Sequence, residues 1–318
     1  MNNCILTYGH VLRGHGFARF AGSIAMVVLS QAVFSQTARP IEAFAGIPPT
    51  AFLAGQIGGE RIRIHCLLRP GDNPHTYEPR PRQTDALGGA GFYFSSGFPF
   101  ELSLIRNLAG GGSAVRVVHT ERGIPGPREG GNVAERHDRH QPKKARHEDP
   151  HIWLSPALLR IQANTICDAL MAVDPRSTSI YEGNLSRFLA GLDTLDRWIG
   201  RTLAPYRGRA FLVFHPSFGR FAEAYGLRQT AIEIEGKSPS PRQLSAFVHT
   251  ARSENIRVVF VEPQFESRSA KAVADAVGGR IERMDPMAGD VLDSLRNLTL
   301  ALVRSFAEAD ATAGGKVR

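Results

Sequence analysis

The sequence predicts an α/β fold of two lobes whose mainly parallel sheets are joined by one long helix. Short apolar segments alternate with helical segments in each half of the 318-residue chain. Segments that are apolar throughout, such as residues 210–214, are typical of parallel strands that helices cover on both faces. A long helical pattern at residues 175–203 separates the two alternating halves. A chain of this length has room for two medium-sized domains.

The first half predicts one set of strands and helices. Strands are expected at residues 41–47, 61–68, 92–95 and 115–119, with helical segments from Pro48 and over 81–90. In the second of these strands, Ile62, Ile64 and Cys66 alternate with basic residues, the period of two that a half-buried strand shows. Residues 121–150 are rich in Gly, Pro, His and charge, which predicts a long loop.

The middle of the chain predicts two helices. Ser155 is a plausible N-cap for a helix at 155–172, with Pro156 at its first position. Between 175 and 203, apolar residues recur mostly at steps of three and four, which gives one apolar face along roughly eight turns. We therefore expect an N-terminal lobe at 39–173, a linking helix at 174–204 and a C-terminal lobe at 205–318.

The second half repeats the strand and helix alternation. Strands are expected at residues 210–214, 230–234, 257–261 and 280–284, and a last helix at 291–307.

The N-terminus has the composition of a secretory signal peptide. Arg13 and Arg19 precede an apolar run of 15 residues, 20–34, which is short of the ~20 that a bilayer span needs. Small residues follow, and Ala38 is a possible cleavage point. We expect residues 1–38 to be removed and the mature protein to be periplasmic. No Cys directly follows the apolar run, so no lipid anchor is expected. The alternative is a buried helix at the start of a domain.

Composition excludes some classes of protein. The chain is 42% hydrophobic and 21% charged, as expected of a folded globular protein. Its net charge of +8 does not come from one sustained basic run, so we expect no nucleic-acid partner. We also expect the protein to be a monomer. The cysteines are Cys4, Cys66 and Cys167, and no CxxC occurs. Whether Cys66 and Cys167 pair in an oxidising compartment stays open.

Four residues are candidates for a metal site. Ligands of open α/β sheets bind beyond the carboxyl ends of strands. His75 follows the strand at 61–68, His215 directly follows that at 210–214, and Asp285 directly follows that at 280–284. His151 lies between the polar loop and a helix. Only tertiary folding could bring residues so distant in sequence together, which favours a site between the lobes.

The donor types favour zinc. Three imidazoles and one carboxylate suit a tetrahedral zinc ion, whereas calcium and magnesium prefer oxygen ligands. Each histidine alone is weak evidence, and the hypothesis depends on the shared position of three of the four residues after strands.

Several segments occur together in the order seen in one family. They are Gly58-Gly59, Pro70-Gly71, Pro74-His75-Thr76-Tyr77-Glu78-Pro79, Gly97 with Glu101, Asp149-Pro150-His151-Ile152-Trp153-Leu154-Ser155-Pro156, Phe214-His215-Pro216-Ser217-Phe218, Glu262-Pro263-Gln264-Phe265 and Asp285-Pro286. The chain resembles, over about residues 41–308, the zinc/manganese-binding solute-binding proteins of ABC importers, the TroA-like superfamily.

This resemblance implies two α/β lobes joined by one long helix, a divalent metal as cargo and an ABC permease in the membrane as partner. It implies His75, His151, His215 and Asp285 as metal ligands. The third position is His in zinc-type members and often Glu in manganese-type members, so zinc is expected and manganese is less favoured. The loop at 132–148 contains only His137, His140 and His147, fewer than in the His-rich loops of zinc-type relatives.

The leading hypothesis is extracytoplasmic capture of zinc for an ABC importer, and the chain is not expected to be an enzyme. A manganese- or iron-binding member of the same family is the runner-up. A zinc hydrolase is a further alternative, but HExxH and Gly-x-Ser-x-Gly are absent from the sequence. An interaction protein of the adhesin type is a third class.

Residues near these segments have two interpretations each. Glu101 could accept a hydrogen bond from a ligand or begin a helix, and Glu262 could support the site or end a strand. Trp153 and Phe218 are expected to be packing residues, and Arg80 and Arg82 exposed surface.

Overall fold

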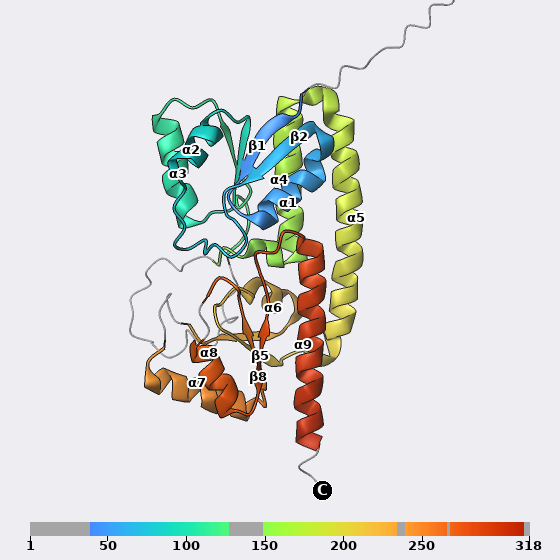
Figure 1. The fold of residues 1–318 in the computed structure, drawn as a ribbon. Coiled ribbons are helices and arrows are strands. Elements are labelled where there is room, and N and C mark those ends of the chain that lie inside the picture. The colour runs from blue at the N-terminus through green and yellow to red at the C-terminus, as the bar shows by residue number, and fades with distance from the viewer. Residues whose placement is uncertain (1–38, 127–148, 234–238, 266–267, 315–318) are drawn as a thin grey trace, which may run out of the picture. The chain divides into compact units, whose positions relative to one another are not determined.

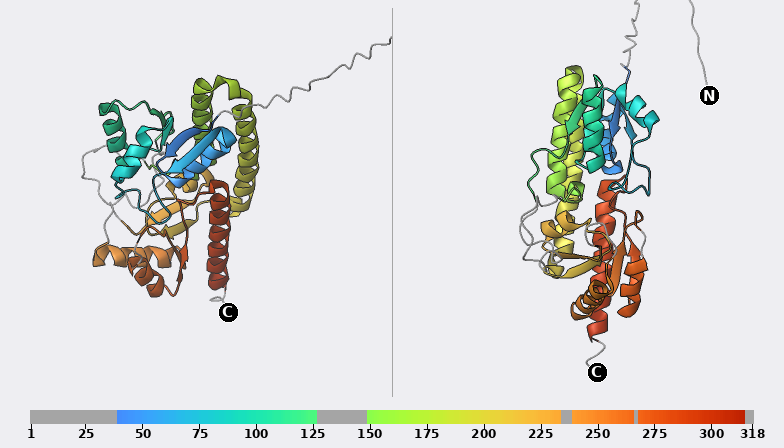
Figure 2. Two further views of the ribbon diagram at one scale, coloured as in Figure 1. Left: turned by 45° about the horizontal axis from the view of Figure 1, so that its top comes forward. Right: turned by 90° about the vertical axis from the view of Figure 1, so that its left-hand side faces the viewer.

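The computed structural model describes residues 39–126, 149–233, 239–265 and 268–314. The predicted signal peptide, residues 1–38, and the loop histidines His137, His140 and His147 lie outside these ranges. Two four-stranded sheets, all of whose strand pairs are parallel, form the framework. Figures 1 and 2 show the strands and the helices that cover them. The α/β class with two parallel sheets is confirmed.

The first sheet has the strand order β2-β1-β3-β4. Its strands are β1 (Ile41–Ala45), β2 (Ile62–Cys66), β3 (Phe92–Ser95) and β4 (Arg116–His119). Every residue of the inner strand β3 is buried, while the edge strand β2 alternates between less and more exposed residues. The period of two at residues 61–68 predicted a half-buried strand, and the burial pattern of β2 agrees with it.

The second sheet has the strand order β6-β5-β7-β8. Its strands are β5 (Ala210–Val213), β6 (Arg228–Ala231), β7 (Val258–Val261) and β8 (Arg280–Arg283). The inner strands β5 and β7 are buried throughout. Strand β6 begins two residues before the predicted start at 230, since Arg228 and Gln229 continue the ladder with β5.

Five helices begin with proline, which has a backbone angle suited to the first helical position and no N–H to leave unpaired. They are α1 (Pro48–Gly58), α2 (Pro81–Gly88), α3 (Pro99–Gly110), α4 (Pro156–Val173) and α7 (Pro241–Ser253). The remaining α-helices are α5 (Thr178–Leu203), α6 (Gly219–Tyr225), α8 (Arg268–Ala276) and α9 (Val291–Gly314). Short 3₁₀ turns flank several of them, among them η1 (Gly59–Arg61), η3 (Ile152–Leu154), η4 (Pro175–Ser177) and η5 (Ala204–Tyr206).

The predicted linking helix is α5, which is 26 residues long. It contacts α1 and α4 of the first half and α6 and α9 of the second half, as Figure 1 shows. The buried residues along it, such as Phe188, Leu192 and Ile199, lie on the apolar face that the sequence pattern predicted. One continuous apolar core contains residues of both halves, including these and Leu295 of α9. The domain boundaries at 173/174 and 204/205 stay a prediction.

Both cysteines in the described ranges are free thiols, Cys66 half-buried and Cys167 buried, so the structure does not contain the disulfide left open by the sequence. Within these ranges no helix is long and apolar enough to cross a bilayer.

Candidate metal centre

Three of the four predicted ligands lie together. One ring nitrogen from each of His75, His151 and His215 lies within 4.8 Å of the other two. The Nε2 atoms of His75 and His215 are 3.1 Å apart. The ring centroids are 4.8 Å apart for His75 and His215, 5.6 Å for His151 and His215, and 6.0 Å for His75 and His151. No other group of three metal-binding side chains occurs among the described residues.

Local backbone contacts position two of these histidines. His75 lies in the segment after β2, and its main-chain N–H donates to Oδ1 of Asn73 at 2.9 Å. His151 lies immediately before η3, and Oδ1 of Asp149 contacts both its main-chain N–H, at 3.0 Å, and its ring Nδ1, at 2.8 Å. The Nε2 atom of His151 thereby remains available for a cation.

His215 follows the buried strand β5 and is constrained on several sides. Its Nδ1 is 2.8 Å from Oε2 of Glu233. Its main-chain N–H donates to Oε2 of Glu262 at 3.1 Å. The ring of Phe265 stacks on the imidazole, with centroids 4.4 Å apart and planes inclined by 20°.

The third imidazole has fewer polar contacts. As a whole residue His75 is exposed, although its ring packs against those of His151 and His215, whereas His151 and His215 are only 3% and 8% exposed. The ring of His75 packs edge-on against Phe98, with centroids 5.5 Å apart. Among the described residues, no carboxylate is hydrogen-bonded to this ring.

The environment favours neutral imidazoles. Burial of the ring among its neighbours, followed by the nearby His215 and His151, lowers the pKa of His75 from 6.5 to about 3. Burial also lowers the pKa of His215, although the hydrogen bond to Glu233 opposes this shift. Because the neutral imidazole is the form that binds a metal ion, the lowered pKa values of His75 and His215 favour the binding-competent form of these two rings at neutral pH.

Asp285 is not a member of the group defined by the three histidines. It follows β8, half-buried, and its Oδ1 accepts hydrogen bonds from Nε2 of Gln264 at 2.7 Å and from the main-chain N–H of Met287 at 2.9 Å. These contacts leave Oδ2 as the oxygen for a cation, and its role as a ligand stays a prediction.

Glu101 belongs to the start of α3. Its carboxylate accepts hydrogen bonds from the main-chain N–H groups of Ser96 and Phe98 and from the hydroxyl of Tyr93, each at 2.9 Å. The structure therefore favours the helix-start interpretation, in which Glu101 binds the main chain of Phe98, a residue whose ring contacts His75.

The other neighbours have structural contacts. Glu262 lies at the end of β7, and its carboxylate accepts a hydrogen bond from the main-chain N–H of His215. It therefore both ends a strand and supports a residue of the cluster. Trp153 is buried and donates its indole N–H to the carbonyl of Pro286 at 2.7 Å, and Phe218 is buried. Arg80 and Arg82 are exposed, as expected.

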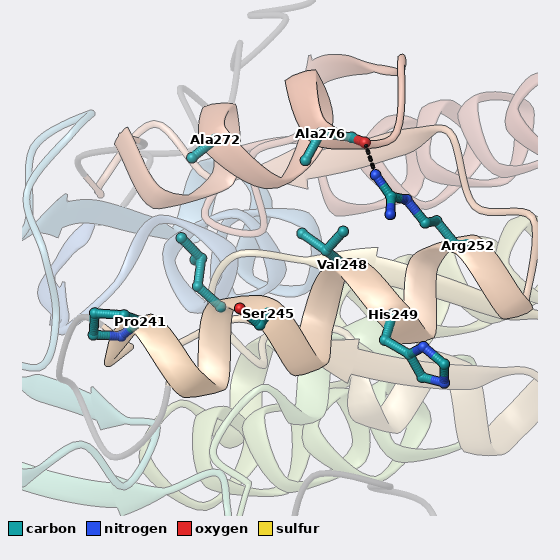
Figure 3. Close-up of a pocket in the computed structure, with 8 residues that line it drawn as sticks. Pro241, Ser245, Val248, His249, Arg252, Ala272 and Ala276 are labelled. Atoms are coloured by element: carbon teal, nitrogen blue, oxygen red, sulfur yellow. Dashed lines mark hydrogen bonds between the residues drawn. The ribbon is translucent and has the colours of Figure 1, made fainter.

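A separate hollow of about 620 Å³ lies between α7 and α8 (Figure 3). Leu244, Val248, Ala272 and Ala276 form its apolar lining, and the guanidinium of Arg252 donates to the carbonyl of Ala276 at 2.8 Å. It contains none of the predicted metal ligands.

Sequence reasoning missed Glu233 as a partner of the site, and it recognised Asp149 and Phe265 only as parts of motifs. The Asp149 contact had a sequence signal, because an Asp two residues before a ligand histidine can turn back onto it. Glu233 was placed inside the strand predicted at 230–234, whereas β6 ends at Ala231, so its position after a strand end was not visible in the sequence.

Two parallel α/β sheets bridged by a long helix, with an imidazole cluster beyond the strand ends, define the class of metal-binding solute-binding proteins of ABC importers. The chain belongs to the ZnuA family, described as "Zinc-uptake complex component A periplasmic", whose model matches residues 44–307. Proteins of this family are not enzymes but extracytoplasmic components that capture metal ions for membrane permeases. The hydrolase alternative is accordingly not favoured.

Known proteins of this kind resemble the chain over most of its length. A crystal structure of ZnuA superposes with a TM-score of 0.76 at 36% identity and covers 84% of this chain and 99% of that one. The high-affinity zinc uptake system protein ZnuA of Yersinia pestis is 27% identical over 267 residues, 78% of this chain and 83% of the relative. The manganese ABC transporter substrate-binding lipoprotein PsaA of Streptococcus pneumoniae is 27% identical over 238 residues, 70% of this chain and 72% of the relative.

Proposed function

We propose that the cargo is zinc and that His75, His151 and His215 coordinate it, with Asp285 as the fourth ligand. The convergence of three imidazole nitrogens within 4.8 Å of one another carries this proposal. Tetrahedral ligands at zinc–nitrogen distances of about 2.0–2.1 Å lie about 3.3 Å apart, close to the 3.1 Å between the Nε2 atoms of His75 and His215. Three neutral nitrogen donors suit zinc better than manganese, which favours oxygen-rich ligand sets.

The proposed cycle begins outside the cytoplasm, after removal of residues 1–38. The chain, as a monomer without a nucleic-acid partner, replaces the water shell of the ion with its own ligands. It then delivers the ion to the permease of an ABC importer. The family of the chain supports this cycle.

Calorimetric titration of the metal-free mature protein with zinc tests the assignment. We expect one ion per chain, and we expect His215→Ala to weaken binding strongly. Absence of zinc binding, or binding that His215→Ala leaves unchanged, would refute the proposal. X-ray absorption of the loaded protein then separates three from four protein ligands, since replacing Asp285 by Asn changes the oxygen shell only if Asp285 binds.

Manganese is the second candidate cargo, because a relative named for manganese is as similar as one named for zinc. Competition between the two ions for the apo-protein distinguishes them. We expect zinc to displace manganese at equal concentration, in agreement with the general order of divalent affinities. Retention of manganese against equimolar zinc would contradict the zinc assignment.

A further inference from the structure

The imidazole of His215 has one ring nitrogen on each of two different partners. Its Nε2 lies 3.1 Å from Nε2 of His75, in the cluster, and its Nδ1 lies 2.8 Å from Oε2 of Glu233, outside the cluster. A neutral imidazole carries one N–H and one lone pair, and either nitrogen can carry the proton. Zinc capture needs the lone pair on the nitrogen that faces the other histidines.

The sheet register places Glu233 beside His215. The ladder between β5 and β6 continues beyond both strands, because the main-chain N–H of Ile232 donates to the carbonyl of Val213 and that of Glu233 donates to the carbonyl of Phe214. Glu233 is thus fixed next to the residue that precedes His215. It is only 6% exposed, so water competes little for its carboxylate.

An ionised carboxylate can only accept hydrogen bonds. Opposite Nδ1 of His215 it therefore stabilises the tautomer with the proton on Nδ1, which leaves the lone pair on Nε2. Among the described residues, His215 is the hydrogen-bonding partner of the Glu233 side chain. The stacked ring of Phe265 restricts rotation of the same imidazole.

The three histidines differ in the carboxylate that contacts the imidazole ring. The partner of His151 is Asp149, two positions earlier in the chain, and the His75 ring has no carboxylate partner among the described residues. Glu233 is 18 positions from His215 and reaches it only through the fold of the second sheet.

We propose that Glu233 is a positioning residue of the metal centre, which fixes the tautomer and orientation of His215 so that Nε2 faces His75 and His151. This inference rests on the proposed function, because it takes His215 as a ligand of the cargo. Carboxylates in such positions contribute about 10- to 100-fold to metal affinity.

The test compares Glu233→Gln with Glu233→Asp. The Gln side chain has the same size, but its amide can either donate or accept, so it no longer imposes one tautomer. The Asp side chain remains an acceptor only. Long-range ¹H–¹⁵N NMR of the metal-free proteins, at a pH above the ordinary imidazole value of about 6.5, reports the tautomer of His215. Zinc titration of the same samples gives the affinity.

We expect His215 of the wild-type protein to carry its proton on Nδ1 alone. In Glu233→Gln we expect both tautomers of His215 and zinc binding that is about 10- to 100-fold weaker. In Glu233→Asp we expect the single Nδ1–H tautomer again. The matched control is Glu254→Gln, which removes a carboxylate bound to Arg228 of the same strand β6 and should keep wild-type affinity.

A single Nδ1–H tautomer together with unchanged affinity in Glu233→Gln would overturn the role of Glu233. That role is equally overturned if the control loses as much affinity as Glu233→Gln. Failure of the wild-type protein to bind zinc would instead overturn the proposed function, and the tautomer in the metal-free protein distinguishes the two failures.

Discussion

The Nε2 atoms of His75 and His215 lie 3.1 Å apart, although 140 positions separate the two residues in the chain. Two neutral imidazoles at this distance hold one nitrogen lone pair each toward the same space unless one nitrogen is protonated. A cation between them would replace this contact with two coordinate bonds. Ring nitrogens that face one another in this way agree with the proposed cation site.

Replacing His75 by Ala should weaken zinc binding by more than the roughly 10- to 100-fold expected for a supporting residue, because a direct ligand is lost. His249→Ala, on helix α7, is the control, since His249 lines the separate hollow and not the cluster. Competition with a chelator measures the zinc dissociation constants of both variants. An affinity of His75→Ala within about twofold of wild type would contradict the proposed ligand set.

The apo-protein should become less stable as the pH falls below about 6.5, the ordinary value for histidine. Burial lowers the pKa of His75 to about 3, so the unfolded chain binds a proton over this range while the folded chain does not. Stability is therefore complete above the unfolded value and is lost as pH falls toward the folded one. Urea unfolding at several pH values measures how steeply the free energy of unfolding changes with pH.

His75→Ala should flatten that slope, since the residue responsible is gone. The same low pKa means that zinc binding should persist below about pH 6.5, rather than fall off near the value of an unperturbed imidazole. A half-loss of zinc binding at about pH 6.5 that persists in His151→Ala would contradict the lowered pKa of His75.

Glu101 should give the opposite pH dependence. Burial raises its pKa to about 7, against the opposing hydrogen bonds from Phe98, Ser96 and Tyr93. Between about 4.5 and 7 the folded state keeps a proton that the unfolded state has lost, so stability is present at low pH and falls as the pH rises through this window. The difference in unfolding free energy between wild type and Glu101→Gln, followed over pH, isolates this contribution. A pH-independent difference would contradict the raised pKa.

Gly46→Ala should destabilise the chain by about 1–3 kcal/mol, because overpacking a filled site costs this much. A Cβ at Gly46 would lie only 2.0 Å from Oε1 of Glu101, which is buried and whose carboxylate is held by three hydrogen bonds that a shift would disturb. Gly55→Ala is the matched control, because its Cβ would meet only Ile64, at an ordinary 3.7 Å, within helix α1. There we expect a gain of about 0.5–1 kcal/mol. Equal effects in urea unfolding would refute the close contact at Gly46.

Much of the fold was predictable from local patterns. The apolar run at 210–214 predicted a strand covered on both faces, and β5 is buried throughout, because a strand buried on both faces has no polar side. Pro48 and Pro156 indicated helix starts, since proline fits the first turn of a helix but not its interior. The start of β6 was displaced, because Arg228 and Gln229 are polar and their place in the ladder depends on pairing with β5.

By itself the sequence determined which segments become strands and helices and which histidines follow strand ends, because these depend on neighbours along the chain. Tertiary structure alone decided that three imidazoles share one space and that Glu233 contacts His215. Such contacts depend on the register between β5 and β6 and on how the two halves pack along α5. Neither the register nor this packing can be inferred from the spacing of the residues in the sequence. The role of Asp285 as a metal ligand remains a prediction for the same reason. Its position after β8 was visible in the sequence, but coordination depends on the direction of its side chain, whose Oδ1 accepts hydrogen bonds from Gln264 and Met287.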